Sequence, residues 1–260
     1  MVNKCGEHWI LLRGLARESA HWGDFVAKLQ ANYPSATINT LDLPGTGKYF
    51  QQSSPNKIPQ IADQVRANAY GHGLLKQPVI LLAVSLGAMV AWEWLQRYPD
   101  DSCGAVLINT SFANLSPFYQ RIRWQSYGKL FLLTRHRDIY QRELGIVQLV
   151  SNQEGHYAQI AKEWAGIQIT RPISLISTIN QLVAAATYRP NKAKPKPPIL
   201  LLNCKNDRLV SAVCSEAIQK QWNLELRTNQ WAGHDLTLDD SGWVLTQLQQ
   251  WIANQHSNFG

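Results

Sequence analysis

The sequence predicts an α/β protein built on a mainly parallel sheet of about six or seven strands flanked by helices. Short apolar runs recur along the 260 residues, and helix-length stretches separate most of them. The runs are almost continuously apolar, as strands covered on both faces are, whereas half-exposed strands alternate apolar and polar residues. Because connections through helices are right-handed crossovers, they bring successive strands into the sheet in parallel.

Six runs are the expected strands, of which the first five are strongly apolar and the last is weaker. In chain order they are WILLR at 9–13, ATINTLDL at 36–43, VILLAV at 79–84, AVLIN at 105–109, PILLLNC at 198–204 and NLELRTN at 223–229. Their spacing leaves room for a helix between most neighbours, which fits the alternation of strand and helix in an α/β sheet.

This alternation fails once, between residues 109 and 198. The interval contains several helical patterns, including 117–133 and 173–188, and it closes with the proline- and lysine-rich linker RPNKAKPKPP. A chain of 260 residues accommodates one sizeable core with an insertion. We therefore expect an α/β core formed by 1–110 and 198–260, with a helical cap inserted at 111–197.

Composition indicates an ordered globular protein, with 45% hydrophobic and 17% charged residues. The uncharged run at 77–92 is shorter than the roughly 20 apolar residues that cross a bilayer, so we expect no membrane span. The first fourteen residues carry charges and lack the apolar core of a secretory signal. These features predict a cytoplasmic protein.

The cysteines and histidines do not form a recognisable metal motif. No CxxC or HExxH spacing occurs, and three of the four cysteines lie in or beside expected elements, where reduced buried thiols are common. The GTG at 45–47 lacks the third glycine of a dinucleotide-binding fingerprint. We therefore expect no structural disulfide, no metal site and no cofactor. The cysteines are Cys5, Cys103, Cys204 and Cys214.

The net charge of +7 favours acidic partners or substrates. Much of it comes from the segment 121–142, which has one acidic residue, Asp138, and six basic ones. This segment is either a solvated helix face or a docking face for an acidic partner. Because no nucleic-acid-binding signature accompanies it, we expect no nucleic-acid partner. The basic residues are Arg121, Arg123, Lys129, Arg135, Arg137 and Arg142.

The pentapeptide AVSLG at 83–87 places Ser85 between an expected strand and an apolar helix pattern. A sharp, strained strand-to-helix turn needs small residues two positions before and after the serine, and Ala83 and Gly87 meet this requirement. The turn presents the hydroxyl at the carboxyl edge of the sheet and at the positive end of a helix, where an oxyanion is stabilised. This context predicts a nucleophile, whereas an isolated buried serine would satisfy its hydroxyl on a nearby carbonyl.

A nucleophilic serine needs a histidine base and usually an acid that orients the base. Asp207 follows the expected strand at 198–204, and His234 follows the one at 223–229, so both lie at carboxyl ends of strands. The predicted catalytic residues are therefore Ser85, Asp207 and His234. Asp235 and Asp239 compete as the acid, although both follow the histidine closely.

Five motifs resemble those of α/β-hydrolase fold proteins, and the similarity runs over nearly the whole chain. They are LLRGL, DLPGTGK, AVSLG, NDRLV and AGHDL. The chain is most similar to capped esterases, among them the pimeloyl carrier-protein methyl ester esterases. The resemblance implies a Ser85–Asp207–His234 triad and an oxyanion hole made by the backbone N–H groups of Leu15 and Leu86. The chain departs from the usual His-Gly after the first strand, where it has Arg13 and Gly14.

We therefore expect a cofactor-free serine hydrolase that cleaves a carboxylic ester or thioester through an acyl-enzyme on Ser85. The alternatives are a non-catalytic binding protein of the same fold, a carbon–carbon bond hydrolase and an acyltransferase. Some members of the family take their substrate from an acidic carrier protein, so the basic segment 121–142 is a candidate docking face for such a carrier.

Overall fold

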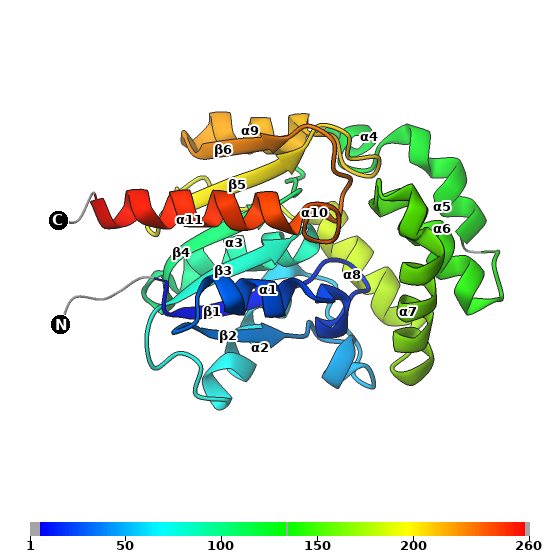
Figure 1. Ribbon diagram of the computed structural model, residues 1–260, viewed down its shortest axis with the longest axis horizontal. Coiled ribbons are helices and arrows are strands. Elements are labelled where there is room, and N and C mark those ends of the chain that lie inside the picture. Colours follow the sequence, from blue (N-terminus) through cyan, green and yellow to red (C-terminus); the bar gives the residue numbers. More distant parts are fainter. Residues whose placement is uncertain (1–5, 134, 258–260) are drawn as a thin grey trace.

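The computed structural model describes residues 6–133 and 135–257, which form a six-stranded parallel sheet with the order β2-β1-β3-β4-β5-β6 (Figure 1). This confirms the predicted α/β fold with a parallel sheet, including the strand number expected. The strands are β1 (His8–Leu12), β2 (Thr37–Leu41), β3 (Val79–Val84), β4 (Ser102–Ile108), β5 (Ile199–Cys204) and β6 (Glu225–Asn229).

The burial of the strands follows their place in the sheet. Every residue of β3 and β5 is buried, because both strands have neighbours on either side and helices on both faces. The edge strands β2 and β6 are each buried only at their last residue. This edge position explains why the run at 223–229 is the least apolar of the six.

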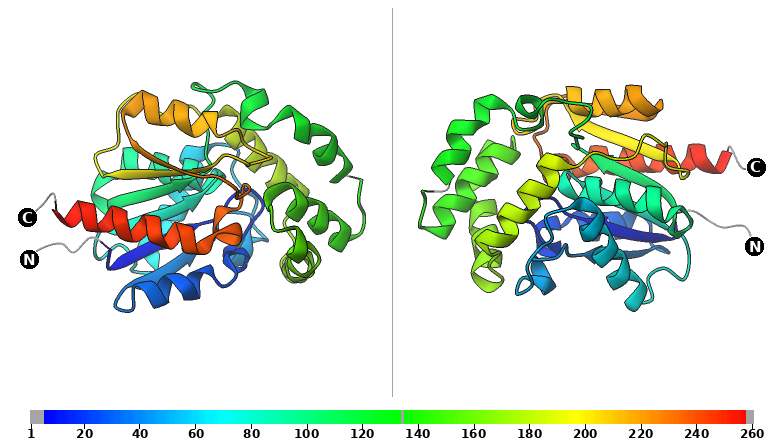
Figure 2. Two further views of the ribbon diagram at one scale, coloured as in Figure 1. Left: turned by 45° about the horizontal axis from the view of Figure 1, so that its top comes forward. Right: turned by 180° about the vertical axis from the view of Figure 1, so that it is seen from behind.

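Helices cover both faces of the sheet and bury its two hydrophobic layers. One face carries α1 (Phe25–Asn32), α10 (Leu236–Asp239) and α11 (Ser241–Ser257). The other face, seen from behind in Figure 2, carries α2 (Ile58–Gly71), α3 (Leu86–Arg97) and α9 (Val213–Trp222). Short 3₁₀ turns lie at Ser19–Trp22, Gly47–Tyr49, Pro99–Asp101, Trp124–Ser126 and Glu154–His156.

Aromatic packing fixes the helix that follows Ser85. Trp92 of α3 is fully buried, and its ring centroid lies 5.0 Å from that of Phe112 and 4.5 Å from that of Trp222 in α9. Such aromatic pairs add to the free energy gained by burying their area. The start of α3 is therefore held on a rigid part of the core.

The segment between β4 and β5 is mainly helical and lies beyond the carboxyl ends of the strands, at the right of Figure 1. Val147 and Leu149 of α6 bury against Ile160 and Trp164 of α7, so this segment has a small hydrophobic cluster of its own. Its treatment as a separate cap with limits 111–197 stays a prediction. Its helices are α4 (Phe118–Arg121), α5 (Tyr127–Leu133), α6 (Ile139–Val150), α7 (Tyr157–Thr170) and α8 (Leu175–Thr187).

The cysteine prediction needs a correction. Cys103, in β4, is disulfide-bonded, so the expectation of no structural disulfide is wrong. Disulfide pairing depends on the distance between two α-carbons in the folded chain, which cysteine spacing does not reveal. Cys204 and Cys214 are free and buried, and burial raises the pKa of the Cys214 thiol to about 11. Cys5 lies outside the described residues.

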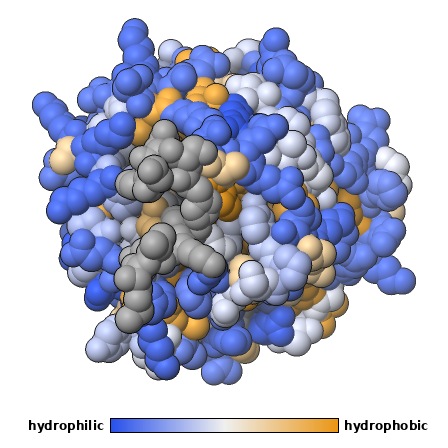
Figure 3. Space-filling view, turned by 60° about the vertical axis from the view of Figure 1, so that its left-hand side comes forward, coloured by the Kyte–Doolittle hydropathy of each residue, from blue (hydrophilic) through white to orange (hydrophobic). Residues whose placement is uncertain are grey.

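The surface around the chain ends is mainly hydrophilic, with small and separate hydrophobic areas (Figure 3). Within the described part of the chain, no helix combines the length and the apolar character that crossing a bilayer requires. The cytoplasmic location stays a prediction.

Candidate active site

Ser85 occupies a strained turn between β3 and α3. Its φ of 55° and ψ of −115° lie in a region that residues other than glycine rarely adopt. The turn is fixed to the end of β4, since the Ser85 N–H donates to the Ile108 carbonyl over 2.8 Å and the Thr110 hydroxyl donates to the Ser85 carbonyl over 3.0 Å. Ser85 is only partly buried, so its hydroxyl lies at the accessible carboxyl edge of the sheet.

Two glycines allow the backbone to pass close to this turn. A Cβ added to Gly87 would lie 2.5 Å from the Arg13 carbonyl oxygen and 2.6 Å from that of Leu12, so only glycine fits. A Cβ on Gly14 would lie 3.2 Å from Ser85 Cβ. The loop after β1 therefore lies directly against the serine, as the candidate oxyanion loop must.

Asp207 and His234 are joined by a hydrogen bond of 2.7 Å between Asp207 Oδ2 and His234 Nδ1. The other carboxylate oxygen, Oδ1, accepts the backbone N–H groups of Leu209 at 2.7 Å and Val210 at 2.9 Å. Both side chains are buried. With Nδ1 engaged by Asp207, Nε2 is the ring nitrogen left to act as a base.

The two competing carboxylates have other partners. Asp235 pairs with Arg13. Burial is the largest single cause and raises the pKa of Asp235, but Arg13, Thr237 and His234 together lower it by more, so the net pKa lies below its usual value. Asp239 accepts the N–H of Gly233 over 2.7 Å and also bonds Ser151 and Asn152. Neither carboxylate therefore orients the ring of His234.

The pKa of His234 lies above its usual 6.5. Burial is the largest single cause and lowers it, but the charge and hydrogen bond of Asp207 together with the charge of Asp235 raise it by more. Arg13 opposes this increase. The ring therefore sits where a proton taken from a nucleophile is stabilised.

Asn109 holds the backbone of His234 against the end of β5. In the described residues no hydrogen bond joins the Ser85 hydroxyl to the His234 ring. Asn109, which follows β4, donates to the His234 carbonyl over 2.8 Å, and its Oδ1 accepts the Cys204 N–H over 3.0 Å. This contact of Asn109 was not predicted from the sequence. The feature that could have indicated it is an asparagine directly after a buried strand.

The backbone N–H groups of Leu15 and Leu86 are the candidate oxyanion donors. Leu86 begins α3, and Leu15 lies in the loop that touches Ser85. The residue after Leu15, Ala16, has a φ of 56°, and its N–H donates to the buried Gln181 side chain of α8 over 2.9 Å. Within 6–133 and 135–257, no hydrogen bond from either leucine N–H to another residue is formed.

The basic segment 121–142 divides into internal and exposed cations. Arg121 is buried and donates to the carbonyls of Ala185 and Ala186, and burial lowers its pKa. Arg121 is therefore an internal brace of the inserted helices, and its inclusion in a docking face is wrong. Lys129, Arg135 and Arg137 are exposed.

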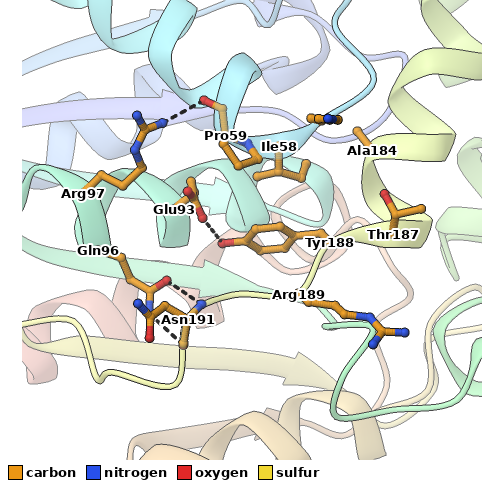
Figure 4. Close-up of a pocket in the computed structure, with 11 residues that line it drawn as sticks. Ile58, Pro59, Glu93, Gln96, Arg97, Ala184, Thr187, Tyr188, Arg189 and Asn191 are labelled. Atoms are coloured by element: carbon orange, nitrogen blue, oxygen red, sulfur yellow. Dashed lines mark hydrogen bonds between the residues drawn. The ribbon is translucent and has the colours of Figure 1, made fainter.

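A pocket of about 460 Å³ lies away from these residues, between α2, the end of α3 and the end of α8. In Figure 4 the Tyr188 hydroxyl points at Glu93, to which it donates over 2.9 Å, and Arg97 donates to the Pro59 carbonyl. None of the candidate catalytic residues lines this pocket. Among the described residues, no group of three metal-binding side chains is close enough to hold an ion.

Known proteins share this arrangement of strands and helices. A model of the alpha/beta hydrolase family matches residues 9–247. The pimeloyl-acyl-carrier protein methyl ester esterase of Xylella fastidiosa strain M23 is 23% identical over 263 residues, which cover 97% of each chain.

Two solved structures show the same fold. An esterase from a Rhodococcus species, strain ECU1013, is 16% identical, with a TM-score of 0.75 over 95% of this chain and 90% of that chain. A hydrolase from Oleispira antarctica is 18% identical, with a TM-score of 0.74 over 96% of this chain and 92% of that chain. Because the family model spans nearly all of the sheet, the chain belongs to the alpha/beta hydrolase family.

Proposed function

We propose that the protein is a serine hydrolase that cleaves a carboxylic ester or thioester through an acyl-enzyme on Ser85. The observation that carries this proposal is the buried Asp207–His234 hydrogen bond, which lies at the same edge of the sheet as the strained Ser85 turn. Membership of the alpha/beta hydrolase family and the similarity to an esterase over the whole chain support it.

The proposed reaction has two halves that use the same base. His234 Nε2 takes the proton of the Ser85 hydroxyl while Oγ attacks the acyl carbon, and Asp207 stabilises the imidazolium that forms. The N–H groups of Leu15 and Leu86 donate to the oxyanion of the tetrahedral intermediate. His234 then passes the proton to the departing alcohol or thiol. In the second half His234 deprotonates a water, which attacks the acyl carbon of the acyl-enzyme. The bond from that carbon to Ser85 Oγ then breaks, His234 returns the proton to Oγ, and the acid is released.

The acyl group of the substrate is attached to an acidic carrier protein in this proposal. The Xylella fastidiosa relatives are named as esterases of a pimeloyl-acyl-carrier protein methyl ester, and this is the support from similarity. The exposed cations Lys129, Arg135 and Arg137 lie in the inserted helical segment beyond the strand ends, where a carrier would approach Ser85. Attraction between these cations and an acidic surface would raise the rate of association.

Replacement of the nucleophile tests the proposal. Ser85→Ala should lower kcat for p-nitrophenyl butyrate by several orders of magnitude and abolish labelling by a fluorophosphonate, with the circular dichroism spectrum unchanged. Ser53→Ala, a change at an exposed serine, is the matched control and should behave as the wild type.

Full turnover by a folded Ser85→Ala variant would overturn the proposal. If the wild-type protein neither hydrolyses esters and thioesters nor reacts with the fluorophosphonate, the protein is a non-catalytic member of the fold. Labelling at Ser85 without ester or thioester hydrolysis would instead indicate carbon–carbon bond cleavage or acyl transfer.

A further inference from the structure

Arg13, which stands where the usual histidine precedes Gly14, makes a bidentate ion pair with Asp235. Its Nη1 lies 3.1 Å from Asp235 Oδ1, and its Nη2 donates to Oδ2 of the same carboxylate. Nη1 also lies 3.3 Å from the Thr237 hydroxyl, and the guanidinium stacks over Trp22 at 4.8 Å from the ring centroid. Arg13 is only 3% exposed and Asp235 only 4%.

The pair connects the two loops that carry the candidate machinery. Arg13 directly follows β1 and stands two residues before Leu15, whereas Asp235 directly follows His234. The backbone of Arg13 also lies against Gly87 at the start of α3. A shift of this side chain would therefore displace the loops on both sides of Ser85.

Because the Arg13–Asp235 ion pair is buried, loss of either partner should be costly. Removing two charges from water is costly, and the cost is offset only when both partners are present in good geometry. An arginine can donate two parallel hydrogen bonds to a carboxylate, which fixes its direction as well as its distance, whereas a lysine cannot. The ion pair thus holds the two backbone segments in one relative position.

We propose that Arg13 and Asp235 are positioning residues that hold the Leu15 loop against the His234 loop and balance the charge beside the His234 ring. Both side chains are buried, so the proposal assigns neither of them a contact with the substrate. The inference rests on the proposed function, since it assigns the two residues a role in the reaction of Ser85.

The charges around His234 make the proposal testable by pH. Asp207, from the loop after β5, and Asp235 raise the pKa of His234, and Arg13, from the end of β1, lowers it. Arg123 of the inserted segment donates to the Asp207 carbonyl over 2.7 Å, and Asp239 of α10 accepts the Gly233 N–H. With both members of the Arg13–Asp235 pair in place, their effects on His234 oppose each other.

Loss of one member should leave the other uncompensated. Arg13→Met should raise the pKa of His234, because Asp235 then acts alone, and Asp235→Asn should lower it, because Arg13 then acts alone. Both variants should lower kcat about 10- to 100-fold, since the loops lose their common anchor. The double variant should return the pKa towards the wild-type value without restoring kcat.

The measurements are kcat/KM for p-nitrophenyl butyrate from pH 5 to 9 and an NMR titration of the His234 ring. Arg13→Lys keeps the positive charge but cannot form the bidentate ion pair, so it should lower kcat with little change in the pKa of His234. The matched control is Arg66→Met. Arg66 also makes a bidentate ion pair, with Asp101, and its guanidinium stacks on Tyr98. The control variant should leave kcat and the pKa of His234 unchanged.

Shifts of the pKa in the same direction in both single variants, or no shift in either, would overturn the inference. So would an unchanged kcat in folded Arg13→Met and Arg13→Lys proteins. The NMR titration reads the charge balance even if the protein hydrolyses no ester. Failure of the proposed function appears separately, as the absence of Ser85 labelling in the wild-type protein.

Discussion

His234 governs the expected pH dependence, because only its neutral ring can accept the proton of Ser85. Since Asp207 and Asp235 together hold the pKa of His234 above 6.5, kcat/KM should rise with one ionisation centred above that pH and should be low at more acidic pH. The same shift stabilises the fold below pH 6.5, and this contribution is lost as the pH rises through the folded-state pKa. As the pH rises, activity should therefore increase while this contribution to stability is lost. A flat activity profile between pH 5 and 9 would exclude His234 as the base.

At the scale of residues, the sequence predicts side chains that meet because they follow neighbouring strands of the sheet. It misses side chains that meet only through tertiary packing. Asp207 and His234 each follow a recognisable strand, so their convergence follows from a parallel sheet, and the structure joins them. Their action on Ser85 remains part of the proposal. Arg13 and Asp235 are 222 residues apart, and nothing in their spacing indicates that they pair.

The junction of β3 and α3 shows how the environment of an element outweighs its intrinsic preference. Alanine is favoured over glycine inside a helix by about 1 kcal/mol. Gly87→Ala should nevertheless destabilise the protein by roughly 1–3 kcal/mol, because its Cβ would meet two carbonyl oxygens at 2.5 and 2.6 Å. It should also reduce kcat by displacing the Arg13 loop. Urea unfolding and p-nitrophenyl butyrate turnover measure the two effects.

A glycine in α7 is the control for this change. A Cβ on Gly166 would meet nothing within 4 Å, so Gly166→Ala should raise the free energy of unfolding by up to about 1 kcal/mol and leave kcat unchanged. Stabilisation by Gly87→Ala as well would show that the turn tolerates a side chain and that the close approach of Arg13 does not constrain it.

The helical pattern at 117–133 shows why element boundaries escape the sequence. The structure divides it into α4, a 3₁₀ turn and α5. The break occurs where the Arg123 N–H donates to the Leu209 carbonyl over 2.8 Å and the Ser126 hydroxyl to the Arg208 carbonyl over 2.6 Å. Both acceptors belong to the loop after Asp207, so tertiary contacts override local helical preference.

At the scale of the whole molecule, two ion pairs, one of them with both partners buried, tie the inserted helices to the core. Arg17, after β1, bonds Glu143 of α6 over 2.8 Å, and Glu18 bonds Arg171, just after α7. Arg17 and Glu143 are both buried, so a rearrangement that left either charge buried without its partner would be strongly destabilising. These ion pairs therefore hold α6 and the end of α7 against the loop after β1.

The exposed cations Lys129, Arg135 and Arg137 should make the association rate with an anionic substrate sensitive to salt. The Debye length falls from about 30 Å at 0.01 M to about 8 Å at 0.15 M ionic strength, so long-range attraction weakens over this range. We expect kcat/KM for an acyl group on an acidic carrier protein to fall with added salt, and kcat/KM for the neutral p-nitrophenyl butyrate to stay constant. Replacing Lys129, Arg135 and Arg137 together by glutamate should lower the first value and remove its salt dependence.

A control variant must separate the effect of where the positive charges lie from the effect of the net charge. Lys192, Lys194 and Lys196 are exposed in the linker before β5, and their replacement by glutamate changes the net charge equally. If the exposed cations of α5 and the segment after it guide the carrier to Ser85, the linker variant should keep most of the wild-type rate and salt dependence with that substrate. Equal losses in both variants would mean that overall charge alone sets the rate, and no loss in either would identify the basic segment as a solvated surface.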